Sequence, residues 1–411
     1  MTSTAPAERA APGVPGVGPP GYQRRAHPGE PIRSPAFLGV VLVSLGGPLA
    51  LAALYAPTIV ADASASAGLV TVSAAVVFAV PLLVWLRYSR HVAGSGGLYA
   101  FVEAAAGRRV ALVQAGLWTA SYLLYLMYTT ASIAYDTLPA VLPGVQPYRP
   151  VVEVALPIVL AAVMLAGRAV TLAVTGLLAV GQVVLVAALA AVTLGHGAAA
   201  GSFTLQAPVG AVRTATAQTA LLYVCGSLPL FLGGELATPS RTVRRGLVGG
   251  YLLVAAGVVA TVAPLAANPA FTRAPIPGVA VARVFGGPGL AVAVGLGVAA
   301  SIAGVMLVEY LALSRLLHVV TRRPTGTVIG VLAVPLVVAG PVSLIDPEGF
   351  YNALLKPSLV ALWLSQLVVF AVYPRFAARR GSNPLLSAAL ALGACAFAVY
   401  GIWATLQHAT T

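Results

Sequence analysis

Charged side chains are scarce in this chain. Asp, Glu, Lys and Arg together make up 8% of its 411 residues, whereas residues of the AVILMFWYC set make up 59%. A soluble domain carries about 25% charged residues, because its surface must face water. The scarcity of charge therefore excludes a soluble globule and indicates a chain that is solvated by lipid.

Cysteine and histidine are scarce as well, and neither residue forms a cluster. The two cysteines, Cys225 and Cys395, fall in different apolar runs, and the five histidines are dispersed. A disulfide framework needs several cysteines, and a metal site needs Cys or His ligands at close spacing. We therefore expect no disulfide, no metal and no cofactor. The few acids are scattered too, which argues against a membrane-embedded enzyme.

Long apolar runs make up most of the chain. A helix that crosses the hydrocarbon core needs about 20 apolar residues. Eleven runs reach this length, at roughly 36–60, 67–86, 110–134, 150–167, 169–194, 216–236, 247–267, 287–314, 325–344, 350–373 and 384–406. The predicted fold class is an all-α integral membrane protein with about eleven transmembrane helices, numbered here as spans 1 to 11.

The formal net charge of +13 is distributed by loop. Basic residues fill every second loop: Arg24, Arg25, Arg33, Arg87, Arg90, Arg108, Arg109, Arg168, Arg241, Arg244, Arg245, Arg315, Arg322, Arg323, Arg375, Arg379 and Arg380. The other loops hold Arg149, Arg213, Arg273 and Arg283 together with Asp62, Asp136, Asp346 and Glu348. This is the positive-inside pattern, which predicts a cytoplasmic N-terminus and, with an odd number of spans, an external C-terminus. The basic charge is explained by topology, so no nucleic-acid partner is predicted.

Spans 1 and 6 are both interrupted near mid-depth. The interrupting residues are Ser44, Gly46, Gly47 and Pro48 in span 1, and Cys225, Gly226, Ser227 and Pro229 in span 6. Broken backbone is tolerated at this depth only against protein or a water-filled cavity, because each freed polar group costs several kcal/mol. Paired interruptions in two inverted halves point to the midplane binding site of a transporter. The alternative is a pair of simple kinks, since Gly and Pro are common in transmembrane helices.

Three segments resemble the amino acid–polyamine–organocation superfamily of permeases. GSGGLYAFVEAAAGRR after span 2 is similar to the family's GG-x-Y signature, and GELATPSRTVRRGL after span 6 to its NPxRT loop. LALSRLLHVVTRRP at the end of span 8 resembles its SRxLYAxARD segment. The resemblance implies a five-plus-five inverted-repeat core with broken helices 1 and 6, and secondary transport of amino acids or amines. The interruptions themselves depart from the family's usual residues.

This core suggests three parts of the chain. Residues 1–33, rich in Ala, Pro and Gly, are predicted to be a disordered cytoplasmic tail. Residues 34–380 would form the ten-helix transporter core, and residues 381–411 an additional C-terminal transmembrane helix. The predicted substrate-binding residues are Ser44, Gly46, Gly47, Pro48, Tyr122, Tyr125, Cys225, Gly226 and Ser227.

The two tyrosines of this set belong to an aromatic face on span 3. Trp118, Tyr122, Tyr125 and Thr129 follow one another at helical spacing. Facing the interrupted spans, they would supply an aromatic wall with hydroxyl groups. Ordinary packing or an interfacial belt is the alternative.

Three more residues are candidates for ion coupling or gating. The resemblance implies a cation-binding role for Ser301 in span 8, where similar sodium-coupled members place a hydroxyl; the alternative is that this lone serine bonds to a carbonyl of its own helix. Glu309, inside the same span, is a candidate for proton coupling or for an inner-gate ion pair, because a charge costs about 2.5–3.5 kcal/mol at the bilayer centre. Lys356, the only lysine, would snorkel to the interface or face the substrate.

The predicted function is a secondary active transporter in the cytoplasmic membrane. It would move an amino acid or related amine by alternating access, with H⁺ or Na⁺ as the coupling ion. Its partners would be this small-molecule substrate and the lipid bilayer. The alternatives are a transport-inactive sensor or scaffold of the same fold, and a transporter of another class.

Overall fold

A computed structural model describes residues 31–92, 94–196 and 200–407. Eleven helical segments in it are long and apolar enough to cross a membrane. In order, spans 1 to 11 are Ser34–Ile59, Ala61–Ser89, Arg108–Val141, Pro143–Leu165, Arg168–His196, Val209–Glu235, Pro239–Leu265, Pro277–Thr321, Thr325–Ser343, Pro347–Ala378 and Pro384–Gln407. Each overlaps one predicted run, so the all-α membrane fold is confirmed. Most of the predicted N-terminal tail lies outside the described residues.

Several spans consist of more than one helical element. The α-helices are α1 (Ser34–Ser44), α2 (Pro48–Ala50), α3 (Ala56–Ile59), α4 (Ala67–Ser89), α5 (Leu98–Ala106), α6 (Arg108–Ser132), α7 (Leu138–Val141), α8 (Arg149–Leu165), α9 (Arg168–His196), α10 (Val209–Leu221), α11 (Pro239–Leu265), α12 (Pro269–Thr272), α13 (Pro277–Val281), α14 (Gly287–Thr321), α15 (Thr325–Ser343), α16 (Pro347–Ala371), α17 (Tyr373–Ala378) and α18 (Pro384–Gln407). The 3-10 helices are η2 (Ala61–Ser66), η4 (Pro143–Tyr148), η5 (Ala200–Phe203) and η6 (Leu222–Glu235), and the π-helices are η1 (Leu51–Tyr55), η3 (Ile133–Thr137) and η7 (Ala282–Gly286).

Proline and capping residues set where several of these helices begin. Pro48, Pro239 and Pro347 each start a helix, where a missing N–H costs nothing. Ahead of α16, the carboxylate of Asp346 accepts a hydrogen bond from the Gly349 N–H at 2.9 Å. The helix starts therefore follow from local sequence.

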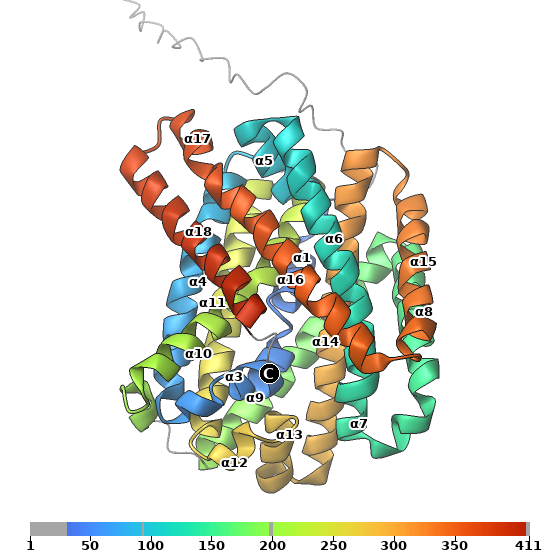
Figure 1. Cartoon of the computed structure of the whole chain (residues 1–411), viewed down its shortest axis with the longest axis vertical. Helices are drawn as coiled ribbons and strands as arrows, with labels where there is room; N and C mark the ends of the chain where they lie inside the picture. Colours follow the sequence, from blue (N-terminus) through green and yellow to red (C-terminus); the bar gives the residue numbers. More distant parts are fainter. Residues whose placement is uncertain (1–30, 93, 197–199, 408–411) are drawn as a thin grey trace, which may run out of the picture. The chain divides into compact units, whose positions relative to one another are not determined.

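The interrupted spans lie at the centre of the bundle. Within the most apolar window of each, 83% of the residues of span 1 and 72% of those of span 6 are buried, against 28% for span 4. α1 packs against α9, α11 and α14, and α6 lies along α16 (Figure 1). The core of the bundle is thus built around the two segments in which the sequence places glycine and proline.

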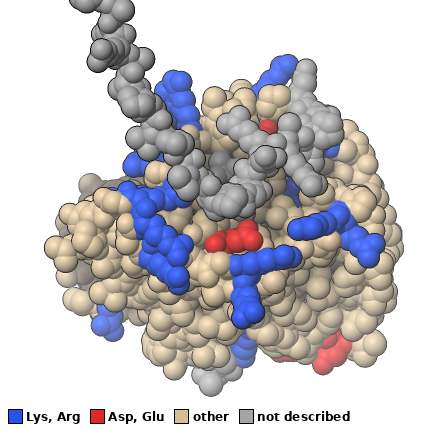
Figure 2. Space-filling view, turned by 90° about the horizontal axis from the view of Figure 1, so that it is seen from above, with Lys and Arg blue, Asp and Glu red and all other residues tan. Residues whose placement is uncertain are grey.

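The two ends of the bundle differ in charge. α5 and α17 lie at one end, and α12 and α13 lie at the other (Figure 1). Figure 2 views the first end, where blue Lys and Arg side chains surround a small red acidic patch. This agrees with the loop pattern of the sequence, while the assignment of this end to the cytoplasm stays a prediction. The division into a ten-helix core and an extra helix also stays a prediction, and α18 packs on α16 and α4.

Candidate functional site

The interruption of span 1 lies at Gly46 and Gly47. α1 ends at Ser44, the two glycines have φ values of 79° and 66°, and α2 begins at Pro48. Glycine adopts positive φ readily because it has no Cβ. A Cβ at Gly47 would also contact the hydroxyl oxygen of Ser301. The break therefore occurs at the predicted residues, and Gly47 lies tightly against span 8.

Ser301 joins three spans. Its buried hydroxyl donates a hydrogen bond to Gln182 Oε1 on α9 at 2.7 Å and accepts one from the Ala50 N–H at 3.2 Å. Ala50 lies in the first turn of α2, where N–H groups have no partner within the helix. Ser301 thus caps the second half of span 1, instead of bonding to its own helix. Its role as a cation ligand stays a prediction.

Span 6 changes its helical pitch where the sequence predicts a break. α10 ends at Leu221 and the chain continues as the 3-10 helix η6 for 14 residues. Such helices rarely exceed four residues, so this length is unusual. Ser227 is buried, with its hydroxyl bonded to the Val224 carbonyl and to Gln366 on α16. The interruption of span 6 is therefore a tightened helix.

The interrupted segments contact each other. A Cβ placed on Gly46 would lie 3.0 Å from the Leu222 carbonyl oxygen, and one placed on Gly226 would lie 2.8 Å from Leu45 Cδ2. The small residues thus allow close packing of span 1 on span 6. Because Leu45 occupies the space beside Gly226, contact of substrate with Gly226 stays a prediction.

The aromatic face of span 3 lies against span 6. The Trp118 ring centroid is 4.2 Å from that of Tyr122 and 4.5 Å from that of Phe231 on η6. The Tyr122 hydroxyl lies 3.9 Å from Cys225 Sγ. Span 3 therefore brings the buried Trp118 and Tyr122 to the residues around Cys225. Whether this aromatic face binds substrate or only packs stays open.

Glu309 is fully buried beside the same residues. Its Oε1 accepts a hydrogen bond from Cys225 Sγ at 3.8 Å, which continues the chain from Tyr122. Its Oε2 has no hydrogen-bond partner among the described residues. Elements of three other spans, α2 of span 1, α6 of span 3 and η6 of span 6, pack against α14, which carries Glu309. Spans 1, 3, 6 and 8 thus meet around this helix.

Farther along α6, a pair of tyrosines joins span 3 to span 10. The Tyr128 hydroxyl donates to the Tyr351 hydroxyl at 2.7 Å, and their ring centroids are 4.4 Å apart. Along α6, Trp118 lies on one side of Tyr122 and Tyr128 on the other. Along span 3, Tyr122 therefore lies between Trp118 and the Tyr128–Tyr351 pair.

A second acidic residue, Glu235, forms the ion pairs that the sequence suggested for Glu309. Its buried carboxylate lies 2.5 Å from Arg315 Nε on α14 and 3.3 Å from Arg168 NH1 at the start of α9. Its carbonyl also accepts a hydrogen bond from the Ile32 N–H, just before α1. We call Glu235, Arg168 and Arg315 the Glu235 cluster.

In the sequence, Glu235 and Arg315 both fall in segments that resemble family motifs, and Arg315 also counts among the basic loop residues, but nothing there pairs them. The available signal was that both follow spans that end at the same, basic side. Lys356 is half-buried on α16, in the same helix as Tyr351. Its substrate or coupling role stays a prediction.

Comparison with known proteins identifies the architecture. No family model matches the chain, and no curated protein matches its sequence. Among solved structures, the crystal structure of MhsT in complex with L-phenylalanine matches over 90% of this chain and 98% of that chain, with a TM-score of 0.62 and 14% identity. The chain has the fold of MhsT. At this identity the match shows the fold alone, and the resemblance to the amino acid–polyamine–organocation superfamily stays a prediction.

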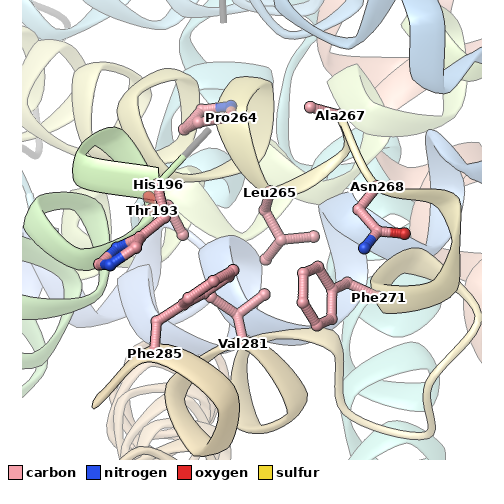
Figure 3. Close-up of a pocket in the computed structure, with 9 residues that line it drawn as sticks. All are labelled: Thr193, His196, Pro264, Leu265, Ala267, Asn268, Phe271, Val281 and Phe285. Atoms are coloured by element: carbon pink, nitrogen blue, oxygen red, sulfur yellow. The ribbon is translucent and has the colours of Figure 1, made fainter. Parts of the chain in front are cut away.

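A separate cavity of about 200 Å³ lies at the C-terminal ends of α9 and α11, beside α12 and α13 (Figure 3). The His196 ring stacks on Phe285 with centroids 4.4 Å apart, and Phe271 packs edge-on against Phe285. None of the predicted site residues lines this cavity. It is therefore distinct from the group around Glu309.

Proposed function

We propose that this chain is a secondary active transporter of an amino acid or a related amine. The observation that carries the proposal is the convergence of spans 1, 3, 6 and 8 on Glu309, beside the interrupted segments. MhsT, which has the same fold, was crystallised with L-phenylalanine. A buried ionisable group inside a bundle usually faces a substrate or ion pathway, because its charge is costly there.

Alternating access requires that the site open to one side at a time. In this proposal the Glu235 cluster closes the site on the cytoplasmic side, and the Tyr128–Tyr351 pair closes it on the external side. The distances within these two groups support such closures, since both join spans that would have to separate. The coupling ion is H⁺ or Na⁺, with Glu309 and Ser301 as the respective candidate residues.

Reconstitution of the purified chain into liposomes tests the proposal. We expect an imposed proton or sodium gradient to drive accumulation of at least one radiolabelled amino acid or amine. Ligand binding should also raise the thermal unfolding midpoint of the detergent-solubilised chain, because a ligand that binds only the folded state stabilises it. Binding without accumulation under any gradient would favour the alternative, a sensor of the same fold.

A further inference from the structure

The Glu309 carboxyl group has no basic partner among the residues that the structure describes. Arg315, six positions later, forms an ion pair with Glu235 instead. Arg168 also pairs with Glu235. Glu309 Oε2 is buried without a hydrogen bond. An unpaired negative charge is costly at this depth, so either a proton or a cation from outside the chain must neutralise it.

The same site has few donors for a carboxylate ligand. Within residues 48–51, Pro48 has no N–H, the Ala50 N–H donates to Ser301, and the Leu51 N–H donates to the Gly47 carbonyl. At most one N–H of this turn, that of Leu49, can face a ligand. η6 stays helical, so the N–H groups around Gly226 bond within their own helix. At the two interruptions, the N–H groups left for a carboxylate are thus at most those of Gly46 and Leu49.

The remaining lining suits a positive charge. The Tyr122 hydroxyl lies 3.9 Å from Cys225 Sγ, which donates to Glu309, and Tyr125 follows one turn farther along α6. Tyrosine rings attract a cation over their faces, most strongly when the site is desolvated. A buried carboxylate among tyrosine rings therefore resembles a receptor for an ammonium group.

We infer that the substrate is an organic amine without a carboxylate, whose ammonium group binds Glu309. This rests on the proposed transport function and narrows its substrate class to amines. The ammonium group would displace the proton that neutralises Glu309 in the empty site. When the cation binds, one proton is released to the compartment from which the cation came. When the cation leaves on the other side, Glu309 takes up one proton there, and the empty carrier returns with this proton. The transporter is accordingly an amine–proton exchanger.

Pairs of compounds that differ only by a carboxylate test this inference. We would measure binding of L-phenylalanine and phenethylamine, leucine and isoamylamine, and lysine and cadaverine to the full chain in detergent. At least one amine should bind, and its parent amino acid should bind at least about thirtyfold more weakly, the effect expected when a charged group is buried unpaired. In weakly buffered solution, amine binding should release about one proton per site.

Two variants separate the role of Glu309 from general damage. Glu309→Gln should weaken amine binding about thirtyfold or more and abolish proton release. Glu348→Gln makes the same chemical change at an exposed position on α16 and should change neither. Unliganded thermal unfolding and gel filtration would verify that Glu309→Gln is folded, and Glu309→Asp should retain proton release if the chain tolerates it.

The outcomes distinguish this inference from the proposed function. Binding and uptake of the parent amino acids without the amines would overturn the inference and leave a transporter in place. Full amine affinity in folded Glu309→Gln would also overturn it. Failure of every compound to bind or accumulate would count against both the amine site and the transport function.

Discussion

Single residues hold the interrupted spans together through bonds that cross between helices. Ser301 connects α14 to Gln182 on α9 and to Ala50 in α2. Ser314, on the same helix and equally buried, bonds to the Leu311 carbonyl of its own helix at 2.8 Å and to no other helix in the described part of the chain. The two serines thus have the same side chain, but the Ser301 hydroxyl connects three helices and the Ser314 hydroxyl bonds within one.

Replacement of Ser301 by alanine should be costly. The change leaves the Ala50 N–H and Gln182 Oε1 buried without their partner, at about 1–3 kcal/mol for each unsatisfied group. Ser314→Ala removes only a bond within its helix, and we expect less than about 1 kcal/mol. Thermal unfolding in detergent would compare the two. Equal shifts would show that the Ser301 hydroxyl does not stabilise the break.

Gly47 offers a second comparison at this scale. Gly47→Ala imposes a positive φ on a residue with a Cβ and places that Cβ against Ser301. Gly107→Ala has the same kind of backbone penalty, about 1–3 kcal/mol, but its Cβ meets nothing within 4 Å. We therefore expect the larger loss of stability at Gly47, measured by the unfolding midpoint of each variant. A larger loss at Gly107 would contradict the tight packing against span 8.

Residue-scale features differ in how far the sequence predicts them. The break at Gly46–Pro48 is predictable because a Gly-Gly-Pro sequence constrains its own backbone. The bond of Ser301 to Gln182 joins residues 119 positions apart and depends on how two helices are rotated against each other. Local sequence has no information about that rotation, so only the type of residue could be named.

At the scale of helical elements, the two halves of the molecule differ in how they interrupt a span. Span 1 leaves the helical conformation at Gly46 and Gly47, whereas span 6 tightens into η6. Gly226 and Pro229 predict that the helix of span 6 is disturbed, but they do not predict that it tightens to a 3-10 helix. In the folded chain, η6 packs against Leu45 of span 1 and Trp118 of span 3. η6 ends at Glu235, so its geometry also positions the carboxylate that joins spans 5 and 8.

Loss of the Glu235 carboxylate should open this end of the bundle. Glu235→Gln leaves Arg315 buried without a counter-charge, which costs about 3–5 kcal/mol and destabilises the closed arrangement. In a Cys395→Ala background, Cys225 should then react faster with a membrane-impermeant thiol reagent applied to inside-out vesicles. Glu103→Gln, the same substitution in α5, serves as the control and should leave the rate unchanged. An unchanged rate in Glu235→Gln would exclude the cluster as a gate.

At the scale of the whole molecule, the positions of the spans are the most predictable feature. Each span is specified by its own apolar residues, because lipid requires about 20 of them wherever a helix crosses. The assembly around Glu309 is not specified in this way, since it needs four spans that are distant in sequence. The sequence therefore predicts which helices exist and where two are disturbed, and the structure adds which side chains meet.

The orientation of the whole bundle follows from charge and can be tested directly. Asp62 lies in η2, ahead of α4, on the side predicted to be external. Arg241 lies in the first turn of α11, on the side predicted to be cytoplasmic, and both side chains are exposed. Single cysteines at these positions, in a chain whose Cys225 and Cys395 are replaced by alanine, should react with an impermeant reagent from opposite sides. In intact cells we expect labelling at residue 62 alone, and in inside-out vesicles at residue 241 alone. Two halves of five spans each are inverted because five is an odd number. Labelling of residues 62 and 241 from the same side would therefore remove the topological basis for an inverted repeat.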